Sequence, residues 1–216
     1  MPIKLISGAG GSLTVTPAST ASNYTLTVPA VTANVVTTGD VGTITGTMIA
    51  AATVSQSNLS QGLTSMTAVA STSGTSIDFT GIPSWVRRIT VSFSGVSTNG
   101  TSLLQIQLGT SGGVQTTGYS GVGWMANTLN AASSNGLLIH GTMAAAYLID
   151  GVGVLTCVNS STGTWAFSIV SSGGLSGTGS VGSGAKTLSG TLDRVRITTV
   201  NGTDTFDAGT INVMYE

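Results

Sequence analysis

The segment WVRRITVSF, residues 85–93, decides the fold of this chain. Its residues alternate in character, and successive side chains of a strand point to opposite faces of a sheet. One predicted face carries Trp85, Arg87, Ile89, Val91 and Phe93, and the other carries Val86, Arg88, Thr90 and Ser92. The pattern predicts a half-buried β-strand whose apolar face turns toward a core.

Similar runs follow along the chain. They are LLQIQLG from Leu103, GLLIHGT from Gly136, YLIDGVGVLTCV from Tyr147, TWAFSIV from Thr164, LDRVRITTV from Leu192 and TINVMYE from Thr210. In the first run, we expect Leu104, Ile106 and Leu108 to point inward and Gln105 and Gln107 to point outward. Asn-Gly pairs at 99–100, 135–136 and 201–202 are typical of hairpin turns. We therefore predict an all-β protein with an antiparallel, jelly-roll-like β-sandwich over residues 77–216.

Residues 1–76 have a different composition. Lys4 and Asp40 are their only charged residues, and Tyr24 is their only aromatic residue. So few large side chains bury too little surface to offset the entropy of ordering one chain alone. We therefore expect an extended N-terminal arm that lies along a partner or winds with other copies. Its sparse apolar residues would form the arm or trimer interface: Val41, Ile44, Met48, Ile49, Val54 and Leu59.

The chain has very little charge. Charged residues make up 6% of it, and the formal net charge is −1, whereas about 25% is typical of soluble proteins. The six basic residues are scattered, which argues against nucleic-acid binding because phosphates require clustered Lys and Arg. No apolar run reaches the ~18 residues of a spanning helix, so membrane insertion is not expected. Such a surface favours an oligomer or a larger assembly.

Several segments resemble structural proteins of tailed-bacteriophage virions. GGSLTVTPASTASNYTLTVPAVTANVVTTGD (10–40) and GTITGTMIAAATVSQSNLS (42–60) resemble the N-terminal or linking segments of such proteins. IDFTGIPSWVRRITVSFSGVSTNGTSLLQIQLG (77–109) and TFDAGTINVMYE (205–216) resemble the C-terminal β-sandwich of tail-fibre-like and head-decoration proteins. The resemblance implies a homotrimer without catalysis, assembled in the bacterial cytoplasm and located in the virion. Its partners would be itself and the major capsid or tail proteins.

One glycine-rich segment looks like a nucleotide-binding loop. GTGSVGSGAKT, residues 177–187, contains G-x-G-x-x-G and nearly matches a phosphate loop. Ala185, however, separates Gly184 from Lys186, and no helix signal follows to supply an N-terminal dipole. We interpret the segment as a flexible loop without a cofactor.

The chain offers few residues for metal binding or catalysis. His140 is its one histidine and Cys157 its one cysteine; with Asp150 they would form a nucleophilic site only if the fold brought them together. A packed histidine and a buried thiol are the simpler interpretation. Asp193, Asp204 and Asp207 offer oxygens for Ca²⁺, although aspartates that cap turns are more common. Paired carboxylates of a glycan depolymerase are a distant alternative.

Four arginines raise the question of a subunit interface. Arg87 shares the predicted apolar face of its strand, and Arg194 and Arg196 share a predicted face with Leu192. Inward arginines require a partner. Arg87, Arg88, Arg194 and Arg196 would therefore form either intersubunit salt bridges or ordinary surface charge at the edge of the sandwich.

Two virion functions remain open. A capsid decoration or cement protein would be anchored by the arm on the shell, where strand pairing adds hydrogen bonds. A short tail-fibre or receptor-binding protein would instead bind a host-surface glycan, for which Trp124 and Tyr119 are the candidate loop aromatics. The short arm leaves little length for a shaft, and we therefore favour decoration.

Overall fold

The computed structural model describes residues 3–6, 12–15, 61–125, 131–173 and 179–216. The chain divides into two compact units, Met1–Ala51 and Ala52–Glu216. In the first unit, β1 (Ile3–Ile6) and β2 (Ser12–Val15) form an antiparallel pair with Ile3 opposite Val15. The six predicted interface residues of the arm, Val41, Ile44, Met48, Ile49, Val54 and Leu59, lie outside the described residues.

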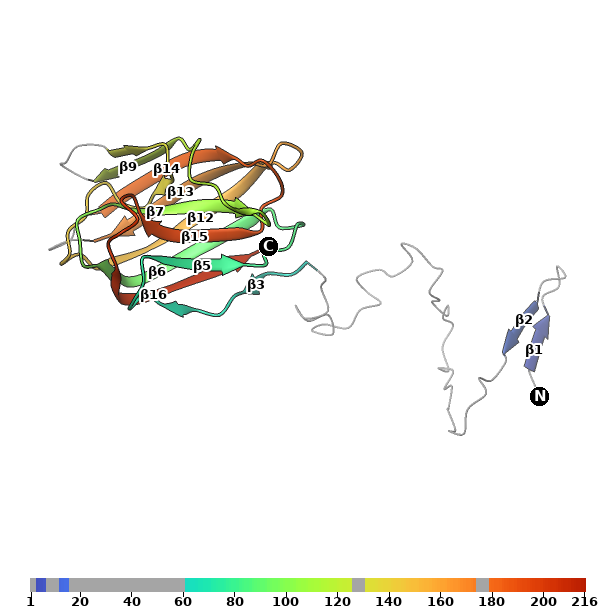
Figure 1. Ribbon diagram of the computed structural model, residues 1–216. Coiled ribbons are helices and arrows are strands. Elements are labelled where there is room, and N and C mark those ends of the chain that lie inside the picture. The colour runs from blue at the N-terminus through green and yellow to red at the C-terminus, as the bar shows by residue number, and fades with distance from the viewer. Residues whose placement is uncertain (1–2, 7–11, 16–60, 126–130, 174–178) are drawn as a thin grey trace. The chain divides into compact units, whose positions relative to one another are not determined.

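The second unit consists of two antiparallel sheets, which Figure 1 shows as two layers. The larger has nine strands, in the order β10-β9-β14-β13-β12-β6-β16-β3, with β4 also paired to β16. Its strands are β3 (Thr64–Ser65), β4 (Val69–Ala70), β6 (Arg88–Thr98), β9 (Gly121–Met125), β10 (Ala131–Ser133), β12 (Ile149–Asn159), β13 (Thr164–Ser172), β14 (Gly179–Thr187) and β16 (Phe206–Tyr215). The predicted all-β, antiparallel, sandwich-like fold is confirmed, and the described residues contain no helix.

The smaller sheet has five strands, in the order β11-β7-β15-β5, with β8 also paired to β7. They are β5 (Ser76–Thr80), β7 (Leu104–Thr110), β8 (Gly113–Val114), β11 (Leu137–Leu138) and β15 (Arg194–Thr199). Among the described residues, no helix is long and apolar enough to cross a membrane.

The core lies between the two sheets and follows the predicted alternation. On β13, Trp165, Phe167 and Ile169 are buried. On β6, Ile89, Val91 and Phe93 are buried in the same way. On each strand, every second side chain is apolar and is removed from water between the sheets. Together these side chains form one continuous core, whose burial stabilises the fold.

Both faces of β7 are buried, which the alternation of its residues did not predict. Leu104, Ile106 and Leu108 are buried as expected, but Gln105 and Gln107 are buried as well. Both amides bond to main chain: Gln105 Nε2 donates to the Thr199 carbonyl at 3.3 Å, and Gln107 Nε2 donates to the Asn135 carbonyl at 2.8 Å. Neighbouring chain covers the outer face of this strand, and hydrogen bonds compensate for the burial of its amides.

The glycine-rich segment is a strand and not the predicted loop. Residues 179–187 form β14, which pairs with β13 on one side and β9 on the other. Its inward Gly182 lies opposite Gly123 of β9, and both face the backbone of the segment that contains β11. A Cβ on Gly182 would collide with the Leu138 carbonyl oxygen, and one on Gly123 would lie 2.7 Å from the His140 carbonyl oxygen. The glycines therefore let β11 lie directly on the larger sheet.

The sandwich also includes residues before the predicted boundary at 76/77. Within residues 61–76, β3 and β4 pair with β16, and Met66 N donates to the Val213 carbonyl at 2.8 Å. These short strands cover one edge of the larger sheet, which would otherwise present unpaired main-chain groups.

Candidate functional site: an apolar row on the larger sheet

Four large apolar side chains are exposed in one row on the outer face of the larger sheet. The strand registers place Val152 of β12 opposite Val170 of β13, Val170 opposite Val181 of β14, and Val181 opposite Trp124 of β9. Their exposed fractions are 49% for Val152, 69% for Val170, 44% for Val181 and 47% for Trp124. We call these four residues the apolar row. Val122 of β9, 41% exposed, extends the apolar surface along its strand.

The surroundings of the apolar row carry no charge over most of the face. On one side, the next paired positions are Val154, Ser168, Ser183 and Val122, and the pairing beyond Val152 brings in Ser92 and Asn212. On the other side, the next paired positions are Asp150, Ser172 and Gly179, so Asp150 is the nearest charge to the row, and Arg88 lies toward the opposite end of the strands. The small neutral neighbours on the first side leave the apolar row uncovered within the described part of the chain.

The four predicted interface arginines have partners within the chain. Arg196 makes two 2.7 Å bonds to the Asp78 carboxylate, from Nε and Nη2. Arg194 Nη2 lies 2.7 Å from Asp193 Oδ1, and Arg88 Nη1 lies 2.9 Å from Glu216 Oε1. Arg87 Nη1 donates to the Ser84 and Val86 carbonyls. Any intersubunit role for these arginines stays a prediction.

The predicted faces of three of these arginines, Arg87, Arg194 and Arg196, are wrong, whereas Arg88 lies on the outward face as predicted. A turn in which Val86 N bonds to the Pro83 carbonyl ends just before β6. Arg87 therefore precedes the strand and is exposed rather than inward. In β15, Val195 and Ile197 are the buried apolar residues, and Arg194 and Arg196 alternate with them. Leu192 is buried but precedes that strand, so it does not define the face of the arginines.

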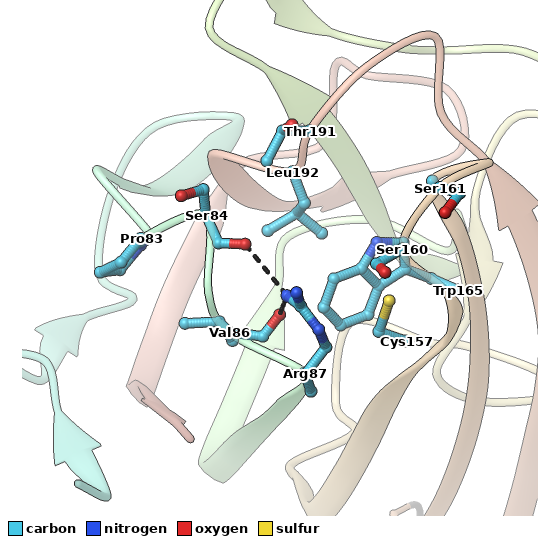
Figure 2. Close-up of a pocket in the computed structure, with 11 residues that line it drawn as sticks. Pro83, Ser84, Val86, Arg87, Cys157, Ser160, Ser161, Trp165, Thr191 and Leu192 are labelled. Carbon is cyan, nitrogen blue, oxygen red and sulfur yellow. Dashed lines mark hydrogen bonds between the residues drawn. The ribbon is translucent and has the colours of Figure 1, made fainter. Parts of the chain in front are cut away.

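A pocket of about 270 Å³ opens at one end of the sandwich (Figure 2). The Trp165 ring, the Cys157 thiol and the Leu192 side chain line it. Arg87 also lines it and is held by its bonds to Ser84 and Val86. The lining residues include no carboxylate and no histidine, so they offer a small recess of mixed polar and apolar character rather than an acid–base pair.

A second depression, of about 370 Å³, lies against the smaller sheet and is polar. Its lining includes Gln107, Thr198 and Arg196. Thr198 Oγ1 donates to the Thr75 carbonyl at 2.8 Å, and hydrogen bonding to Asp78 raises the pKa of Arg196. Ordered amide, hydroxyl and guanidinium groups of this kind suit a polyhydroxyl ligand.

The two aromatic candidates for glycan stacking differ in position. Trp124 lies on β9 and is exposed, whereas Tyr119 is buried, so its prediction as an exposed loop aromatic is wrong. The Tyr119 hydroxyl accepts from Leu108 N at 2.7 Å and lies 2.7 Å from the Gln115 carbonyl. Lys186 Nζ lies 5.1 Å from the ring centroid. Burial raises the pKa of Tyr119 to about 12, and this residue stabilises the fold.

His140 and Cys157 do not form a catalytic pair. His140 packs edge-on against Tyr147 and lies near Ile149, at the start of β12. Cys157 is near the other end of that strand, roughly 25 Å away at ~3.3 Å per residue. Asp150 accepts a hydrogen bond from Gly95 N at 2.8 Å, and it is exposed.

We expect His140 to make the stability of the sandwich depend on pH. Its Nδ1 lies 2.6 Å from the Thr142 carbonyl oxygen, and its buried Nε2 has no hydrogen-bond partner among the residues that the structure describes. Burial therefore lowers its pKa below 6.5. Above pH 6.5 the imidazole ring is mostly neutral in both the folded and the unfolded chain. Below pH 6.5 the unfolded chain binds the proton more readily than the folded chain does. We expect the free energy of unfolding to fall as pH drops from 7.5 to 5.5.

Urea unfolding at those two pH values measures this change, and the His140→Gln variant is the control. The variant should show a flatter dependence, because glutamine does not titrate. An equal dependence in both proteins would assign the effect to other groups.

The three aspartates predicted as Ca²⁺ ligands have separate partners. Asp204 accepts from Ser102 N at 2.9 Å and from Asn201 Nδ2 at 2.6 Å, and the bond from Asn201 lowers its pKa. Asp207 bonds to Ser97, and Asp193 pairs with Arg194. Within the described ranges, no three His, Cys, Asp or Glu residues are grouped as metal ligands would be.

The apolar row is the feature that sequence reasoning missed. Each member is an apolar residue at an outward position of its own strand, a weak signal in any single run. Only the registers between four strands reveal that these residues form one line. The chain matches no protein-family model, no curated protein and no solved structure.

Proposed function

We propose that this protein is a non-enzymatic structural protein of a bacteriophage virion: a homotrimeric capsid decoration protein that its N-terminal arm anchors to the shell. The observation that carries the proposal is the apolar row, which lies on a neutral face in a chain with 6% charged residues. Apolar patches of this kind mark interaction surfaces. The resemblance of the sequence to virion proteins is the reason for proposing a virion as the assembly.

The proposal includes the type of sandwich. We infer a jelly-roll-like sandwich because the chain crosses repeatedly between the sheets, from β5 to β6, from β6 to β7, and from β14 through β15 to β16. Crossing of this kind ties both sheets into one core, as a rigid component of a shell requires.

Particles that lack the protein test the cement function. We expect them to release DNA at a lower temperature than complete particles, because the decoration adds burial and hydrogen bonds across the seams of the shell. A dye that reports free DNA during heating measures the release. Adding the purified protein back should restore the original temperature. Equal release temperatures with and without the protein would contradict the cement function.

A receptor-binding tail-fibre protein is the second candidate. The polar depression beside Gln107, Thr198 and Arg196 favours it, as does the exposed ring of Trp124. Such groups suit the hydroxyls and apolar faces of a host-surface glycan. In this case, particles without the protein would keep their heat resistance and fail to adsorb to cells.

A further inference from the structure

We propose that the outer face of the nine-stranded sheet is the surface through which three copies of this chain associate, with the apolar rows of all three meeting around a three-fold axis. The inference rests on the proposed function for the number of copies. The strand registers and side-chain exposures of the face carry the rest.

The size of the face fits a stable interface between subunits. The five adjacent strands β9, β14, β13, β12 and β6 carry it, and β13 and β14 have 9 residues each. At ~4.8 Å between strands and ~3.3 Å per residue, the face measures about 20 by 30 Å. At its widest, the face therefore has a planar area of about 600 Å², which is below but of the same order as the ~800 Å² that each partner contributes to a standard interface.

The absence of charge favours another copy over a foreign protein. Partners that differ commonly select each other through complementary charges. Here the neutral centre of the face is bounded by Asp150 toward one end and by Arg88, paired to Glu216, toward the other. Two such faces can approach without bringing like charges together over the apolar row.

The width of the face suits a three-fold arrangement. Three faces about 20 Å wide around a common axis place each sheet about 6 Å from that axis, near half of the ~10 Å that separates packed sheets. One layer of side chains therefore fills the space. Because the apolar row runs across the strands, three rows close into one ring when the strands run along the axis. Val170, the most exposed member of the row, would lie in this ring.

Light scattering of the full chain tests the inference directly. We expect wild-type protein to have three times the 21.4 kDa mass of one chain. Val170→Lys would bring three ammonium groups into the ring, where they have no partners, and should give the mass of one chain at the same concentration. Val200→Lys is the matched control, because Val200 is also an exposed valine (40%) but follows a strand of the other sheet. It should remain a trimer.

Further measurements keep the test independent of misfolding. Circular dichroism should show the same β-sheet spectrum for the wild type and both lysine variants. Val170→Thr, which keeps the shape of valine but adds a hydroxyl, should shift dissociation to higher protein concentration. A wild-type monomer, a wild-type dimer, or a folded Val170→Lys trimer would each overturn the inference. A trimer that is absent from particles would leave it standing and contradict the proposed function instead.

Discussion

Replacing Gly182 by alanine is expected to lower the free energy of unfolding by about 3 kcal/mol, the upper end of overpacking costs. Gly182 is buried on β14, and an added Cβ would collide with the Leu138 carbonyl oxygen and lie 2.8 Å from Ile169 Cγ2. Neither neighbour moves freely, because Leu138 is paired to Gln105 and Ile169 belongs to the core. The alanine must therefore push β11 away from the larger sheet.

Gly179→Ala on the same strand is the control. Its added Cβ would have the Ser171 carbonyl oxygen 3.9 Å away as its nearest neighbour, an ordinary contact. Urea unfolding of both variants at pH 7.5 measures the difference. Gly179→Ala should stay within about 0.5 kcal/mol of the wild type. Equal losses for the two variants would show that β11 does not lie tightly on the glycines.

Alternation predicted the strands that carry large side chains. The runs that contain Ile89, Ile106 and Phe167 all became buried strands, because a period of two in large apolar residues has one simple solution in a sheet. β14 escaped this reasoning. Ser180, Gly182 and Gly184 occupy three of its inward positions and have little hydrophobic contrast, and the closeness of β11 requires the two glycines. The sequence of β14 alone does not reveal that β11 packs against it.

The phase of a strand also depends on where it begins. The turn at residues 83–86 places Arg87 outside β6, so counting back by twos from Ile89 assigned Arg87 to the wrong face. The apolar row was hidden for a related reason. Val152, Val170 and Val181 come from three strands, and their alignment depends on registers that turn geometry and core packing determine together.

Removing residues 1–60 is expected to abolish attachment to the particle while leaving the sandwich folded. The predicted arm residues Val41, Ile44 and Met48 fall within this deletion, and with them most of the apolar surface that we propose lies on the shell. The truncation ends before β3 and β4, whose pairing with β16 protects the edge of the sheet. Circular dichroism and thermal unfolding of the truncated chain provide the folding control.

Co-sedimentation with particles that lack the protein measures attachment, and it tests the central claim that this chain is a component of the virion most directly. The full chain should pellet with such particles in a saturable manner, and the chain without residues 1–60 should stay in the supernatant. A full chain that stays in the supernatant at every concentration would contradict the claim.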